Sequence, residues 1–167
     1  MINKEQRVGV FVDIQNMYYS ARALYNSRVN FKEILKEAVK GRKLVRAIAY
    51  AVKSGEKEEE SFHKALYEIG FEVKLKELQI FYGGNKKADW DVGLSIDAIE
   101  LAPKLDVIIL VSGDGDYIPL VEHLRRALGC KVEVLAFGRS CSSRLKEATD
   151  EFTDIDSLKF TIRRHKN

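Results

Sequence analysis

The stretch that most constrains the fold of this chain is residues 107–117, V-I-I-L-V-S-G-D-G-D-Y. Its first five residues are apolar and four of them are β-branched, which is typical of a fully buried β-strand. Two glycines and two aspartates follow at once, and Pro119 stands where the first turn of a helix tolerates proline. This order of strand, acidic turn and helix places carboxylates at the carboxyl end of a strand, where open α/β sheets bind ligands.

Strands and helices alternate along almost the whole sequence. Further buried strands are predicted at residues 7–12, 43–52 and 131–137, and a half-exposed strand is predicted at 71–78. Helices are predicted at residues 16–27, 31–39, 62–69, 89–101, 117–128 and 140–148. The alternation predicts a three-layer α/β/α fold, Rossmann-like, with a mainly parallel central sheet.

Helical spacing also predicts which residues face the core. In the helix at 89–101 these are Val92, Ile96 and Ile99. In the helix at 16–27, Tyr18 is placed with the apolar residues of the buried face. The strand at 71–78 is expected at a sheet edge, where its backbone offers pairing to a second copy while its charges oppose it. The sequence therefore leaves open whether the protein forms a homo-oligomer.

Length and composition bound the class of protein. The 167 residues favour a single domain, residues 1–167, with a core at about 7–155 and a C-terminal tail at 156–167. The net charge of +3 is compatible with a polyanionic partner but does not require one. The two cysteines lack metal-site spacing and are expected to be reduced thiols of a cytoplasmic protein. No apolar run approaches the roughly 20 residues of a membrane span, so no membrane partner is expected.

Acidic residues follow two of the predicted buried strands. Asp13 comes directly after the first strand, and Asp114 and Asp116 follow the strand at 107–111. If these strands are neighbours in a parallel sheet, the three carboxylates meet at one edge and raise one another's pKa. A divalent cation relieves that repulsion, and Mg²⁺ or Mn²⁺ prefers oxygen ligands. The simpler interpretation is that an Asp after a strand caps the next helix or stabilises a turn.

A third source of acidic side chains is the helix at 89–101, which carries Asp89, Asp91 and Asp97. Asp91 and Asp97 are separated by about 240° around the helix, so they do not share a face. Asp91 is the preferred metal ligand because the start of the helix is expected beside the strand ends. Asp89 and Asp97 are the alternatives, and Asp89 is also a candidate N-cap.

Four residues near these acids are predicted to bind substrate. Asn16 can hold a phosphate oxygen or cap the first helix, and Ser112 is either a phosphate donor or a turn hydroxyl. Lys87 is either a phosphate contact or an ordinary solvated charge. Trp90 is the preferred residue to stack on an unpaired base, with Tyr19 and Tyr82 as further candidates.

Three blocks of the sequence carry a resemblance to a known family: F-V-D-I-Q-N (11–16), K-K-A-D-W-D-V-G-L-S-I-D-A (86–98) and S-G-D-G-D-Y-I-P-L (112–120). They resemble the NYN domain family, in particular its bacterial LabA-like (DUF88) branch, which belongs with the PIN-like nucleases. The resemblance runs from about residue 7 to 155. It implies a PIN-like α/β/α fold in which the first strand and the strand at 107–111 are neighbours.

The resemblance also implies a metal-dependent ribonuclease site that binds Mg²⁺ or Mn²⁺. The residues that match the family's catalytic and metal-binding acids are Asp13, Asp91, Asp114 and Asp116. Asn16 matches the family asparagine. Two residues depart from the family pattern, since Ile14 stands where glycine is frequent and Tyr117 where phenylalanine is frequent.

The function predicted from these observations is hydrolysis of single-stranded or structured RNA. The sequence does not distinguish RNA from DNA. One alternative is an NYN domain that binds RNA or a nucleotide without cleaving it. A second alternative is a phosphatase on a Rossmann-like sheet, but the dehalogenase-like type needs an Asp where this chain has Gln15.

Overall fold

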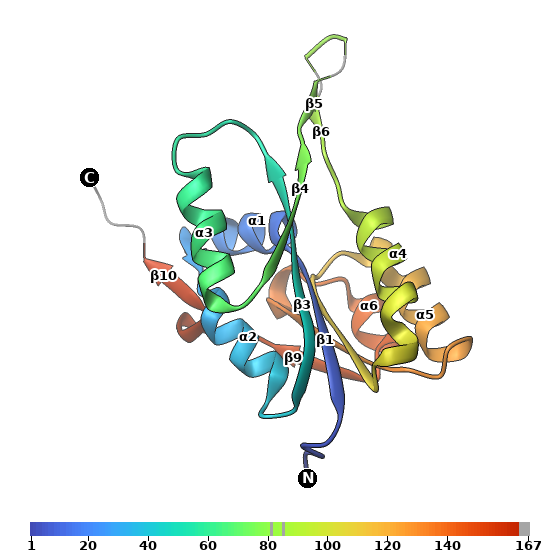
Figure 1. The fold of residues 1–167 in the computed structure, drawn as a ribbon. Helices are drawn as coiled ribbons and strands as arrows, with labels where there is room; N and C mark the ends of the chain where they lie inside the picture. The colour runs from blue at the N-terminus through green and yellow to red at the C-terminus, as the bar shows by residue number, and fades with distance from the viewer. Residues whose placement is uncertain (81, 85, 164–167) are drawn as a thin grey trace.

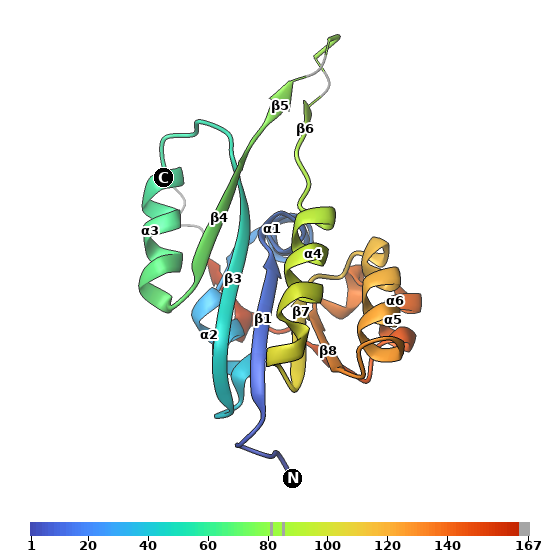
Figure 2. The same ribbon diagram turned by 45° about the vertical axis from the view of Figure 1, so that its right-hand side comes forward.

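The computed structural model describes residues 1–80, 82–84 and 86–163, without the side chains of Lys86 and Lys87. A six-stranded, fully parallel sheet forms the centre of the molecule, with strand order β4-β3-β1-β7-β8-β9. Its strands are β1 (Arg7–Asp13), β3 (Lys43–Lys53), β4 (Glu72–Glu77), β7 (Val107–Val111), β8 (Lys131–Ala136) and β9 (Glu151–Asp154). β1 and β7 are neighbours at the middle of this sheet, as predicted (Figure 2).

Helices cover both faces of the sheet and complete the predicted three layers (Figure 1). One face carries α1 (Ile14–Tyr25), α2 (Phe31–Val39) and α3 (Glu59–Ile69), and the other carries α4 (Asp91–Leu101), α5 (Ile118–Arg126) and α6 (Ser143–Ala148). Short 3₁₀ turns are η1 (Ala102–Lys104), η2 (Gly115–Tyr117), η3 (Gly138–Ser140) and η4 (Leu158–Phe160). The α/β fold with a parallel sheet is therefore confirmed.

Two small antiparallel pairs are added to this centre. β2 (Ser27–Val29) pairs with β10 (Thr161–Arg163), so this part of the segment predicted as a tail lies against the domain. β5 (Gln79–Ile80) pairs with β6 (Lys86–Lys87) in a hairpin that projects beyond the carboxyl ends of the strands (Figures 1 and 2). β4 lies at one edge of the sheet, as predicted, while its pairing with a second copy stays a prediction.

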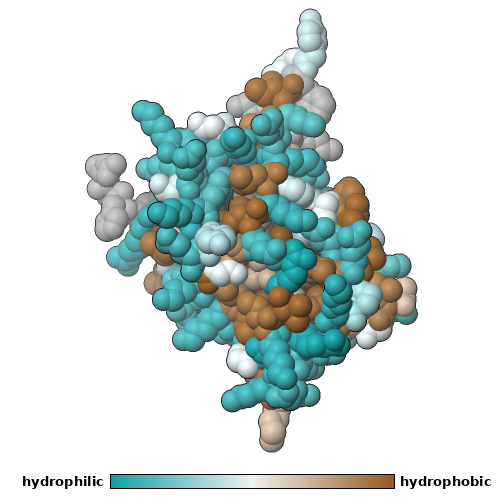
Figure 3. All heavy atoms as spheres, in the orientation of Figure 1, coloured by the Kyte–Doolittle hydropathy of each residue, from teal (hydrophilic) through white to brown (hydrophobic). Residues whose placement is uncertain are grey.

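The buried face predicted for α4 is wrong. Val92, Ile96 and Ile99 are exposed, and Leu94 and Ala98 pack against the sheet instead. The helix is apolar on both sides, so periodicity alone selects no unique face. Figure 3 shows hydrophobic residues interspersed with hydrophilic ones on one face of the molecule.

The start of the first helix also differs from the prediction. α1 begins at Ile14, immediately after β1, and its N-cap is Asp13 rather than Asn16. Ile14, Met17 and Ala21 face the core, and Leu24 and Tyr25 pack partly buried against it. Tyr18, predicted in the core, is 38% exposed.

Candidate metal centre

Asp13 lies at the end of β1, where the chain turns directly into α1. Its Oδ1 atom accepts the backbone N–H of Asn16 at 3.1 Å, which caps the helix. Its Oδ2 atom accepts the hydroxyl of Tyr117 at 3.1 Å and lies 3.5 Å from the hydroxyl oxygen of Ser112. Asp13 is buried, so both carboxylate oxygens are held by the protein rather than by bulk water.

Asp114 lies in the turn that follows β7, the strand beside β1. Its Oδ1 atom accepts the backbone N–H of Asp116 at 2.9 Å, and its own N–H donates to the Ser112 hydroxyl at 3.2 Å. The turn is tied to α1, because the N–H of Gly113 donates to Asn16 Oδ1 at 2.9 Å. A Cβ atom on Gly113 would lie 3.0 Å from the backbone of Cys141, so a side chain there would crowd the turn.

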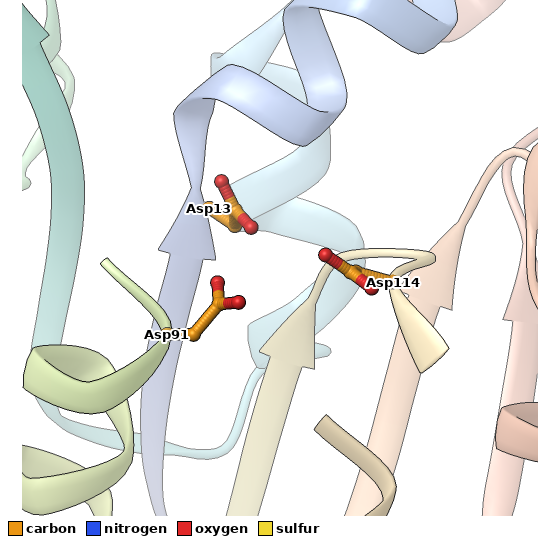
Figure 4. Close-up of side chains that lie close together, drawn as sticks. All are labelled: Asp13, Asp91 and Asp114. Carbon is orange, nitrogen blue, oxygen red and sulfur yellow. The ribbon is translucent and has the colours of Figure 1, made fainter. Parts of the chain in front are cut away.

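Asp91, the first residue of α4, brings a third carboxylate to the same point. Asp13, Asp91 and Asp114 each offer an oxygen within 4.8 Å of the oxygens of the other two. Figure 4 shows the three side chains converging from β1, the start of α4 and the turn after β7. We call this group the aspartate triad.

The aspartate triad is electrostatically strained. Burial raises the pKa of Asp13 to about 6, and the charges of Asp91 and Asp114 add to the increase. Hydrogen bonds from Asn16 and Tyr117 oppose this increase. Burial, and then the charge of Asp114, likewise raise the pKa of Asp91. Such a group of close carboxylates gains most from a cation placed among them.

The donor set fits a hard divalent cation. All three ligands are carboxylate oxygens, which Mg²⁺ and Mn²⁺ prefer over nitrogen or sulfur. Oxygens around an ion at 2.0–2.1 Å lie at most about 4.2 Å apart, so a small rotation of the triad side chains brings all three within range. Three protein ligands leave further positions for water or substrate, as Mg²⁺ sites usually do.

The triad opens into a cavity of about 210 Å³. One wall comes from α1, the opposite wall from the start of α4, and Asp13 and Asp114 complete the lining. The lining residues are Asp13, Gln15, Asn16, Tyr19, Asp89, Trp90, Asp91 and Asp114. A larger groove of about 310 Å³ between α5 and α6 contains no member of the triad.

The family model for the NYN domain matches residues 7–156. The chain belongs to the NYN domain family. This confirms the family predicted from the three sequence blocks, and the matched region includes the whole aspartate triad.

Three individual proteins are similar to this chain to different degrees. The low amplitude and bright protein LabA of Synechococcus elongatus is 28% identical, covering 97% of this chain and 90% of its own length. A crystal structure of a Vibrio parahaemolyticus protein of unknown function is 37% identical, with a TM-score of 0.88, and covers 97% of this chain and 99% of that one. The bacteriophage T5 D15 protein, co-crystallised with metal ions, is 14% identical with a TM-score of 0.46, a level at which nothing about the site transfers.

The other predicted ligands of this NYN domain lie outside the triad. Asp116 is exposed beside it, and its charge raises the pKa of Asp91 from there. Asp97 accepts hydrogen bonds from the Tyr50 hydroxyl at 2.8 Å and from Lys74 at 2.6 Å, on another part of α4. Asp89 lines the cavity, but α4 begins after it and Trp90 occupies the N-cap position. Of the three acids predicted near this helix, Asp91 alone is in the triad.

The predicted substrate-binding residues have different surroundings. The Asn16 amide oxygen accepts from Gly113, which leaves its NH₂ group as the donor for a ligand in the cavity. Ser112 is fully buried, and its hydroxyl donates to Asp13 and accepts the backbone N–H of Asp114. The side chain of Lys87 lies outside the described part of the structure.

Trp90 is held in the cavity wall by several contacts. Its indole N–H donates to the Ala51 carbonyl at 2.9 Å, and its ring lies against Tyr50 at 5.3 Å between centroids. A Cβ atom on Gly93 would lie 2.6 Å from the ring, so glycine permits this close approach. Tyr19, on the opposite wall, is 59% exposed and is the more accessible aromatic ring.

Tyr117 is the site residue that sequence reasoning missed. The pattern presented it only as a departure from the family phenylalanine. The structure places its hydroxyl on Asp13, inside the triad. Its place one residue after the acidic pair was the only hint, and the sequence does not say whether a ring there points toward Asp13.

Proposed function

We propose that this NYN domain is a metal-dependent ribonuclease that hydrolyses RNA phosphodiester bonds with Mg²⁺ or Mn²⁺. The observation that carries the proposal is the aspartate triad, in which three separate elements bring carboxylates together beside a cavity. Membership of the NYN family supports it, since the sequence blocks that define the resemblance contain the triad.

No helix in residues 1–80, 82–84 and 86–163 has the length and apolar character needed to cross a membrane.

Asp13, Asp91 and Asp114 would hold the cation. A bound divalent ion lowers the pKa of a water molecule and neutralises charge on the scissile phosphate and the leaving oxygen. Asp116, exposed beside the triad, contributes negative charge at its border and is the fourth acid that we assign to the catalytic site. The Asn16 NH₂ group and Lys87 are the donors that we assign to substrate phosphates. Both cysteines are free thiols, which supports the cytoplasmic location predicted for the protein.

Incubation of labelled single-stranded RNA with the purified protein tests the proposal. We expect cleavage in Mg²⁺ or Mn²⁺ and none in EDTA. Asp114→Asn, purified in parallel, should lack the metal-dependent cleavage, because the triad loses one of its three charges. Cleavage of equal rate in both preparations would contradict the mechanism.

The same samples separate the alternatives. RNA that binds with a clear salt dependence yet stays intact in every metal would favour a binding domain. Release of phosphate from small phosphomonoesters, without action on polynucleotides, would favour a phosphatase. DNA of the same sequence, tested in parallel, decides between the two nucleic acids.

Tyr19→Ala is expected to weaken binding of single-stranded RNA by about 5- to 150-fold, the range for one stacked base. The exposed ring lines the cavity, and a base inside a duplex cannot stack on it. Anisotropy in Ca²⁺, with a gel to confirm that the RNA stays intact, measures the affinity. Tyr67→Ala is the control, since Tyr67 is an exposed tyrosine of α3 that does not line this cavity. Equal affinity of both variants would remove Tyr19 from the RNA site.

A further inference from the structure

Tyr117 is a fully buried side chain whose hydroxyl reaches the aspartate triad. Tyr117 is 1% exposed, and its ring belongs to the hydrophobic core formed with α4 and α5. The hydroxyl donates to Asp13 Oδ2 at 3.1 Å, and the charge of Asp91 acts on it as well. It therefore stands between carboxylates from two different elements, β1 and α4.

The hydroxyl has no structural need to be there. A phenylalanine ring would fill the same core, because the two side chains differ by one oxygen atom. A buried hydroxyl is costly unless it is hydrogen-bonded, so its retention depends on the carboxylates that it meets. Burial and the neighbouring carboxylates raise its pKa, so the phenol stays protonated and acts as a neutral donor.

The hydroxyl completes the restraint of Asp13. Oδ1 of this carboxylate is fixed by the backbone N–H of Asn16 and Oδ2 by Tyr117, so the plane of the group is determined from both sides. Carboxylates that ligate metals are commonly oriented by such hydrogen bonds, and losing one typically lowers metal affinity 10- to 100-fold.

We propose that Tyr117 is a positioning residue of the metal centre, whose hydroxyl holds Asp13 in the orientation that receives the cation. This inference rests on the metal centre of the proposed function. It adds a determinant of metal affinity that a family member with phenylalanine at this position lacks.

Tyr117→Phe tests the inference, with Mn²⁺ alone as the probe. We expect the dissociation constant for Mn²⁺, measured by calorimetry without RNA, to rise about 10-fold or more. A cooperative thermal transition confirms that the variant is folded. The matched control is Tyr50→Phe, because Tyr50 is also 1% exposed and its hydroxyl donates to an aspartate, Asp97, outside the triad.

The outcomes are distinct. Weaker Mn²⁺ binding in Tyr117→Phe, with wild-type affinity in Tyr50→Phe, supports the inference. Wild-type affinity in Tyr117→Phe overturns the inference and leaves the metal centre intact. An equal loss of affinity in both variants also overturns the inference, because it would indicate a general loosening of the structure. Wild-type protein that binds no Mn²⁺ overturns the metal centre together with this role.

A second measurement does not require the Tyr117→Phe variant. Mn²⁺ added to the wild-type protein should perturb the near-ultraviolet absorption of a buried tyrosine, since the cation binds the Asp13 carboxylate to which Tyr117 donates. The Tyr50→Phe protein should show the same difference spectrum. Absence of a tyrosine signal at saturating Mn²⁺ would contradict the inference.

Discussion

Asp13→Asn is expected to abolish metal-dependent RNA cleavage and, at the same time, to stabilise the metal-free protein at neutral pH. The cleavage rate should fall by about 100-fold or more, because the charge stabilisation supplied by a bound cation amounts to several kcal/mol. The fold should tolerate the change, since asparagine is as good an N-cap as aspartate and can still accept the N–H of Asn16.

The gain in stability follows from the raised pKa of Asp13. Its folded-state pKa of about 6 lies above the ordinary value of 3.8, so the folded protein binds this proton more tightly than the unfolded chain does. Wild-type protein therefore loses stability as the pH rises from about 4 to about 6, by up to about 3 kcal/mol. Asparagine carries no charge, so the variant does not lose this part of its free energy of unfolding as the pH rises.

Urea unfolding at pH 4, 5, 6 and 7 in EDTA measures the effect. The difference in free energy of unfolding between variant and wild type should grow between pH 4 and 6 and stay constant above. Mn²⁺ should then stabilise the wild type and leave Asp13→Asn unchanged. Glu100→Gln, which removes an exposed carboxylate from α4, is the control and should match the wild type. A variant that is no more stable at pH 7, or that still cleaves RNA, contradicts this account.

The position of the aspartate triad could be predicted because topology fixes it. Asp13 and Asp114 end parallel strands, and the carboxyl ends of such strands meet at one edge of the sheet. That β1 and β7 are neighbours came from the family resemblance, since chain order alone does not give strand order. The alternative of helix capping was also correct, because one Asp13 oxygen caps α1 while the other remains directed toward Tyr117 and the triad.

Details of side-chain direction could not be predicted in the same way. The spacing of Asp114 and Asp116 does not tell which of them points inward. That depends on the η2 turn, in which the Asp116 N–H bonds to the Asp114 carboxylate. Likewise, α4 is apolar on two faces, so periodicity does not tell that Leu94 and Ala98 are the residues that face the sheet.

The Tyr117 contact lay beyond sequence reasoning for a related reason. The Tyr117 hydroxyl reaches Asp13, at the end of β1, only when η2 and α4 are correctly placed. Such a contact is a property of tertiary structure, and a single sequence presents it as an ordinary aromatic residue.

Arg42→Met is expected to lower the free energy of unfolding by about 3–5 kcal/mol, the typical cost of leaving a buried charge unpaired. The side chains of Arg42 and Glu133 are 3% and 4% exposed and form two hydrogen bonds, of 2.7 and 3.0 Å. Arg42 also donates to the carbonyls of Ala38 and Val39 at the end of α2. Its loss removes the buried partner of Glu133, which then pairs with the partly exposed Lys131 at 3.3 Å, and it removes the side-chain donor to the Ala38 carbonyl.

Urea unfolding at neutral pH measures this loss, and two further variants define its origin. Arg46→Met breaks the ion pair between Arg46 and Glu72, whose side chains are 37% and 53% exposed. This change should lower the free energy of unfolding by no more than about 1 kcal/mol. The double change Arg42→Met with Glu133→Leu should recover most of the stability, because the unpaired charge is gone. Equal losses in Arg42→Met and Arg46→Met would show that the buried pair has no special role.

The Arg42–Glu133 pair also separates folding from function. Arg42 precedes β3 and Glu133 lies in the first half of β8, so the pair is placed toward the amino ends of the strands, whereas the triad lies at their carboxyl ends. Folded Arg42→Met protein should therefore bind Mn²⁺ with wild-type affinity at low temperature. If Mn²⁺ affinity falls in proportion to stability, the triad depends on the whole sheet rather than on its own local hydrogen bonds. Asp13→Asn is expected to gain stability and lose Mn²⁺ binding, whereas Arg42→Met is expected to lose stability and keep Mn²⁺ binding. Measured together, the two variants separate stability from metal affinity.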